Sequence, residues 1–114
     1  MTFELTFELD YKRVMLAVIN DSRNTIPVIA GQDGNAIYAY AQTQIDTVVP
    51  GVLVYRIGSL DGNLGGYLAL QAKNGIATPL MLQLRPAYQP LSLEINEFIS
   101  NFITSGVWQA DYLI

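Results

Sequence analysis

The chain has 114 residues, of which 51% are apolar and only 14% charged, and its formal net charge is −4. This length predicts a single domain over residues 1–114, which buries about two-thirds of the surface of the unfolded chain and needs no disulfide. The chain has no cysteine and no histidine, and its six basic residues are scattered, which excludes a Ser-His-Asp triad, a cysteine nucleophile, a histidine or cysteine metal site and a basic nucleic-acid interface.

The first half of the chain predicts one strand and two helices. Residues 3–9 alternate strictly between apolar and polar side chains, which is typical of a strand with one buried face. Asp10 is expected to cap a helix over residues 11–21, where apolar side chains recur at helical spacing. A connector over residues 25–35 leads into residues 36–45, where strand alternation and helical spacing compete. The alanines and glutamines of this last segment favour a helix.

The middle of the chain predicts a meander of three strands, at residues 52–60, 64–72 and 76–84. All three segments are rich in apolar residues, and residues 52–60 are also rich in β-branched ones. The two connections, Asp61-Gly62-Asn63 and Lys73-Asn74-Gly75, have the composition of tight hairpin turns. Adjacent antiparallel strands are therefore expected here.

The last part predicts a helix over residues 91–104, ended by Gly106, and then a terminal strand over residues 107–114. Together with the strand at 76–84 they would form a right-handed crossover between parallel strands. The predicted fold class is therefore α+β, a single domain with the order β-α-α-β-β-β-α-β. Its sheet is expected to be mixed but mostly antiparallel, with helices packed on it.

Three segments of the chain show a likeness to a known family. Residues 61–70 (DGNLGGYLAL) place an acidic residue and a glycine before a G-Y-x-A/x-L strand. Leu84-Arg85-Pro86 stands where a V-x-P motif ends a strand, and Ala87-Tyr88-Gln89 leads into a helix. In this order the segments resemble the GNAT superfamily of N-acetyltransferases, in a degenerate and C-terminally short form. The resemblance implies a GNAT-like fold and, in active members, acetyl-CoA as cofactor.

The diphosphate loop of that family, Q/R-x-x-G-x-G/A, falls on residues 89–94. Gln89 matches it, whereas Ser92 and Glu94 stand at the small-residue positions and Pro90 has no backbone N–H. A diphosphate is bound by successive backbone amides and the helix dipole. Because a carboxylate in the first turn opposes such binding, we expect no cofactor.

The sequence is first interpreted as a non-catalytic interaction or structural subunit of a larger assembly, such as a virus or phage particle. Low charge and seven tyrosines suggest a covered aromatic surface. A protein partner or a second copy is expected to pair with the terminal strand through Trp108, Tyr112, Leu113 and Ile114. No nucleic-acid or membrane partner, signal peptide or transmembrane segment is expected, so the protein should be soluble, in the cytoplasm or inside a particle.

Two alternatives stay open. In a small acetyl-CoA-dependent N-acyltransferase, the resemblance implies that the main chain of residues 82–85 holds the pantetheine arm and that amides near residues 92–94 hold the diphosphate. The implied cofactor-binding residues are Leu82, Leu84, Arg85, Gln89, Ser92 and Glu94. Tyr112 or Glu94 would transfer the proton. In a small-molecule sensor, the ligand would lie between the strands predicted at 80–84 and 107–114.

Overall fold

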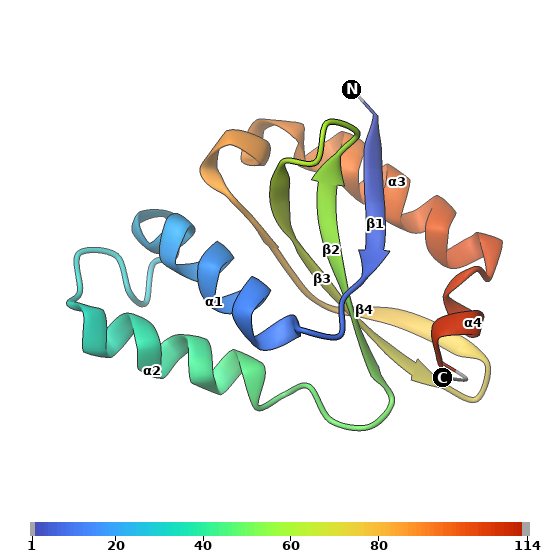
Figure 1. The fold of residues 1–114 in the computed structure, drawn as a ribbon, viewed down its shortest axis with the longest axis horizontal. Helices are drawn as coiled ribbons and strands as arrows, with labels where there is room; N and C mark the ends of the chain where they lie inside the picture. Colours follow the sequence, from blue (N-terminus) through green and yellow to red (C-terminus); the bar gives the residue numbers. More distant parts are fainter. Residues whose placement is uncertain (1, 113–114) are drawn as a thin grey trace.

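One antiparallel sheet lies between two pairs of helices (Figure 1). The computed structural model describes residues 2–112. In chain order its elements are β1 (Phe3–Phe7), α1 (Tyr11–Ser22), η1 (Arg23–Thr25), α2 (Gly34–Ile45), β2 (Val52–Ser59), β3 (Leu64–Lys73), β4 (Ile76–Leu84), η2 (Pro86–Leu91), α3 (Ser92–Ser105) and α4 (Trp108–Tyr112). The predicted α+β class is confirmed.

The four strands follow the order β1-β2-β3-β4, and each pairs antiparallel with the next. Both predicted hairpin turns are present. Asn74 and Gly75 have φ angles of 54° and 78°, which is the left-handed pair that a tight hairpin needs. In this sequential order β1 and β4 are the two edges of the sheet.

The two faces of the sheet carry separate cores because successive side chains of a strand point to opposite faces. One core joins Val54, Tyr67 and Ala69 to α1 and α2. The other core joins Leu68 and its same-face neighbours to α3 and α4. In Figure 1, α1 and α2 lie beside the sheet and α3 crosses behind it.

The helix predicted over residues 36–45 is confirmed, and its start is clear. Asp33 accepts a hydrogen bond from the backbone N–H of Ala36, which caps the first turn of α2. Ile37, Ala41 and Ile45 are buried at a spacing of four residues. That spacing places all three on one side of α2, in the core that α2 shares with α1 and the sheet.

Asp10 does not act as the predicted cap. It stands at the N-cap position of α1, but its side chain makes no capping hydrogen bond. Its carboxylate pairs instead with Arg13 at 3.1 Å, while its own N–H donates to Glu8. The helix also continues to Ser22, one residue beyond the predicted end.

The terminal strand predicted over residues 107–114 is wrong. Gly106 ends α3 in the left-handed conformation, as predicted, but the chain then forms the short helix α4. Trp108 is only 3% exposed and donates its indole N–H to Ile103 O. The predicted parallel crossover is therefore also wrong, and the sheet of residues 2–112 is entirely antiparallel. Leu113 and Ile114 lie outside the described residues.

Candidate functional site

The outer edge of β4 presents unpaired backbone groups. Leu82 pairs with Leu68 in β3, and the N–H of Arg85 donates to Gly65 O at 2.8 Å. Pairs in an antiparallel ladder alternate between hydrogen-bonded and non-hydrogen-bonded, so Leu82 and Leu84 turn their N–H and C=O away from β3. The predicted involvement of these two main-chain positions thus has a geometric basis.

One of these outward groups is already bound within the chain. Leu84 O accepts hydrogen bonds from Ser22 Oγ at 3.0 Å and from Gln89 Nε2 at 3.3 Å. Ser22 is completely buried at the end of α1. The sequence places Ser22 among Asn and Asp residues typical of a loop, so its role was missed. Leu82, in contrast, keeps both backbone groups directed outward with no partner in residues 2–112.

A β-bulge lies two residues before Leu82. Met81 pairs with Ala69, but the next pair along the ladder joins Pro79 to Leu70, so Leu80 has no partner in β3. A bulge bends the strand and changes the direction of nearby backbone groups, and bulges are common beside active sites. The outer edge of β4 is therefore an open strand segment with a bend at Leu80.

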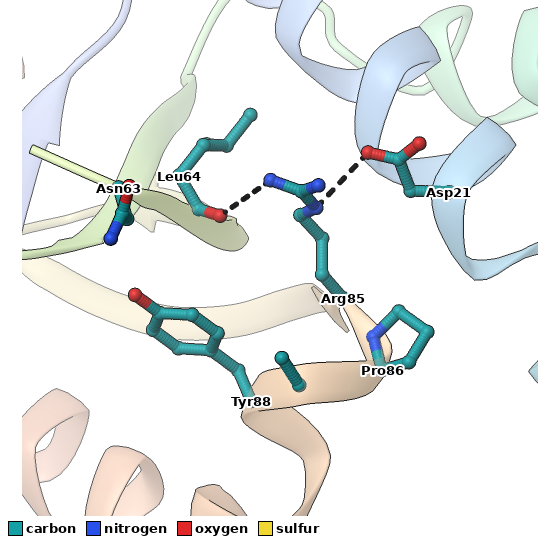
Figure 2. A pocket seen from close by; sticks show the side chains of 7 residues that line it. Asp21, Asn63, Leu64, Arg85, Pro86 and Tyr88 are labelled. Carbon is teal, nitrogen blue, oxygen red and sulfur yellow. Dashed lines mark hydrogen bonds and ion pairs between the residues drawn. The ribbon is translucent and has the colours of Figure 1, made fainter.

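A cavity of about 480 Å³ lies at the carboxyl end of β4 (Figure 2). Its lining comprises Asp21, Asn63, Leu64, Arg85, Pro86, Ala87 and Tyr88. Arg85 crosses the cavity, with Nε 3.0 Å from Asp21 Oδ2 and Nη1 donating to Leu64 O at 3.0 Å. Figure 2 shows the Tyr88 ring on the opposite wall. The cavity thus holds one ion pair between α1 and the end of β4.

Gly65 explains how Tyr88 reaches this wall. A Cβ at Gly65 would lie 2.4 Å from two ring atoms of Tyr88. Real Cβ atoms do not approach other atoms this closely, so only glycine allows the ring to lie there. Gly65 is thus the position at which β3 and the Tyr88 ring approach each other closely.

The predicted proton-transfer residues, Glu94 and Tyr112, line cavities other than the Arg85 cavity. Glu94 lines a different cavity, of about 240 Å³, together with Thr2, Phe3 and Phe98. Tyr112 lines a third cavity with Lys73, at the far end of β3 from the Arg85 cavity. The two ends of β3 are about 30 Å apart at about 3.3 Å per residue. Neither residue shares a cavity with Arg85.

The residues predicted to contact a partner differ in exposure. Trp108 is buried, so the prediction that it forms part of an exposed surface is wrong. Tyr112 is 47% exposed, so its side chain is accessible to a partner. A protein partner or a second copy stays a prediction. Within residues 2–112 no three acidic side chains cluster as metal ligands, and no helix is long and apolar enough to cross a bilayer.

Comparisons with known proteins bear on the fold. No family model and no curated protein matches the sequence. The structure is similar to an acetyltransferase from Thermus thermophilus, with a TM-score of 0.57 and 18% identity over 88% of this chain and 69% of that one. It is also similar to the PaiA N-acetyltransferase from Thermoplasma acidophilum in complex with coenzyme A, with a TM-score of 0.52 and 17% identity over 89% and 74% of the two chains.

This chain has a GNAT-like fold. The resemblance seen in the hairpin at 61–70 and in the segment around Leu84-Arg85-Pro86 is thereby confirmed at the level of fold. The expectation of a virus or phage particle component finds no support in these comparisons.

The residues at the end of β4 in this GNAT-like chain suit the pantetheine arm of coenzyme A but not its diphosphate. The outward N–H and C=O of Leu82 suit the amides of a pantetheine arm, which could pair with the edge as an added strand does. The diphosphate needs free amides at the helix start. There Pro86 and Pro90 have no N–H, and the N–H of Ser92 already donates to Gln89 O.

Proposed function

We propose that this chain is an acyltransferase domain that binds the pantetheine thioester of an acyl donor along the outer edge of β4. The observation that carries the proposal is the outward backbone of Leu82, beside the bulge at Leu80, on an open strand edge. An extended ligand with amide groups can pair with such an edge through main-chain hydrogen bonds. The N–H of Leu82 would orient the ligand by donating to one of its carbonyl oxygens.

Two findings support this function over a purely structural subunit. The structural neighbours are acetyltransferases, and one of them was crystallised with coenzyme A. Two of the features expected to form a partner interface differ in the structure, because residues 108–112 are helical and not a strand, and Trp108 is buried; Tyr112 stays exposed. The acyltransferase interpretation therefore replaces the interaction subunit as the first choice.

The proposed reaction moves an acyl group from sulfur to an amine. The C–S bond of the thioester breaks, a C–N bond forms, and the amine loses one proton as the thiol gains one. A hydrogen-bond donor at the thioester oxygen stabilises the negative charge that develops there. In this proposal an outward N–H of β4 near the bulge would serve as that donor.

The test compares Leu82→Pro with Leu82→Val in calorimetric titrations with S-acetylpantetheine. Proline removes the outward N–H but no hydrogen bond to β3, and edge strands tolerate it. We expect Leu82→Pro to weaken binding about tenfold or more, and Leu82→Val to stay within about threefold of the parent. Circular dichroism checks that both variants are folded. Equal binding by a folded Leu82→Pro variant would contradict the proposal.

A further inference from the structure

We infer that the acyl donor is recognised through its pantetheine arm and not through its nucleotide. The inference rests on the proposed function and narrows its donor class to pantetheine thioesters, with or without the adenosine diphosphate of coenzyme A. Three observations at the segment between β4 and α3 lead to it. They concern the backbone amides, the side chain of Gln89 and the charge beside Arg85.

Several backbone amides of this segment are absent or already bonded within the chain. Pro86 and Pro90 have no N–H at all. Three further N–H groups are already bonded. The N–H of Arg85 donates to Gly65 O, that of Tyr88 to Arg85 O, and that of Ser92 to Gln89 O. A diphosphate is held at a helix start by several free N–H groups that converge on it. Tyr88 and Ser92 use their N–H groups for the turns of η2, and Arg85 uses its own to bond to β3, so these positions and the two prolines offer no N–H to a phosphate.

Gln89 is committed as well, although it matches the first position of the diphosphate loop. Its Nε2 donates to Thr25 Oγ1 at 2.8 Å and to Leu84 O at 3.3 Å. A primary amide has two N–H donors, and both are used. The side chain therefore ties η2 to β4 and to the residues after α1, and it offers no donor to a phosphate.

The charge at the end of β4 is balanced before any ligand binds. Arg85 is the cation of the cavity, and its Nε lies 3.0 Å from the carboxylate of Asp21 (Figure 2). A diphosphate entering here would gain the attraction of Arg85 and meet the repulsion of Asp21 at similar distances. The guanidinium also donates to Leu64 O, which fixes its position. Arg85 is thus held as a structural partner of α1 and β3.

The experiment titrates the unmodified chain with acetyl-CoA and with S-acetylpantetheine in the same buffer. We expect dissociation constants within about threefold of each other, and an acetyl-CoA constant that changes little between low and moderate salt, because no phosphate contact is lost to screening. Acetyl-CoA binding at least tenfold tighter than S-acetylpantetheine would overturn the inference and leave the proposed function intact. Binding of neither ligand would overturn both.

A matched variant tests the charge argument. Asp21→Asn keeps the size of the side chain and removes the negative charge that balances Arg85. We expect the preference of this variant for acetyl-CoA over S-acetylpantetheine, taken as the ratio of the two dissociation constants, to be at least threefold greater than that of the parent. The affinity for S-acetylpantetheine should stay unchanged, which controls for the fold. An unchanged ratio of the two constants would overturn the role assigned to Asp21.

Discussion

Single residues at the end of β4 determine how much of its edge stays open. Ser22 is completely buried, and its hydroxyl donates to the outward carbonyl of Leu84. Gln89 adds a second hydrogen bond to the same carbonyl. Together they bind the outward carbonyl of Leu84, whereas Leu82, two residues earlier, keeps its backbone groups directed outward. The bond from Ser22 joins residues 62 positions apart, so the local sequence pattern does not show it.

Substitution of Gly65 tests the close contact between this residue and the Tyr88 ring. In Gly65→Ala the new Cβ would overlap the Tyr88 ring, so the ring must move. We expect the free energy of unfolding to fall by about 1–3 kcal/mol, the usual effect of forcing extra volume into a packed site. Urea unfolding followed by circular dichroism measures it.

Gly34→Ala is the matched control for that variant. Nothing lies within 4 Å of the added Cβ. Gly34 is the first residue of α2, and its backbone conformation is one that alanine adopts. We expect no loss of stability, or a gain of up to about 1 kcal/mol. Equal destabilisation by both substitutions would show that the Tyr88 contact is not the cause.

At the scale of the element, α4 is held by two buried side chains. Trp108 is buried in the core between the sheet and α3. The hydroxyl of Tyr55 in β2 donates to the carboxylate of Asp111. A helix of five residues is too short to be stable alone. Its helical form therefore comes from these tertiary contacts, which is why the apolar sequence of the segment misled the strand prediction.

A double-mutant cycle of Tyr55→Phe and Asp111→Asn measures this anchor. Tyr55→Phe removes the hydrogen bond and leaves the carboxylate without its donor, so we expect a loss of about 1–3 kcal/mol in the free energy of unfolding. If the two side chains act through one bond, the combined variant should lose much less than the sum of the single losses. Additive losses would mean that the Tyr55 hydroxyl does not hold α4.

At the scale of the whole molecule, the buried tyrosines link stability to pH. Burial and the hydrogen bond to Asp111 raise the pKa of Tyr55 well above the ordinary tyrosine value, and burial raises the pKa of Tyr67 in the same way. In the unfolded chain both tyrosines titrate near pH 10. Above that pH the unfolded chain loses protons that the folded chain keeps, so unfolding becomes more favourable.

We therefore expect the stability to be constant, as far as these tyrosines contribute, below about pH 9 and to decrease as the pH rises above about 10. Thermal melts between pH 8 and pH 11 measure the decrease. Tyr67→Phe should reduce the slope, whereas Tyr38→Phe should not, because Tyr38 is exposed. Identical slopes for both variants would contradict the assignment to buried tyrosine.

The sequence alone determined those parts of the protein that depend on neighbouring residues. The strand meander with its two hairpin turns, the helix over 36–45 and the end of α3 at Gly106 follow from side-chain periodicity and turn chemistry. The grouping of Leu82, Leu84, Arg85 and Gln89 was also predictable, because one short segment carries all four.

The tertiary structure alone decided what depends on residues far apart in the chain. It formed α4 around Trp108, paired Arg85 with Asp21, buried Ser22 against Leu84 and put Glu94 and Tyr112 into other cavities. It also decided that Leu82 faces outward, since that depends on the register between β3 and β4. Contacts of this kind form only when the two sheet faces and their helices pack together, and local propensity carries no information about them.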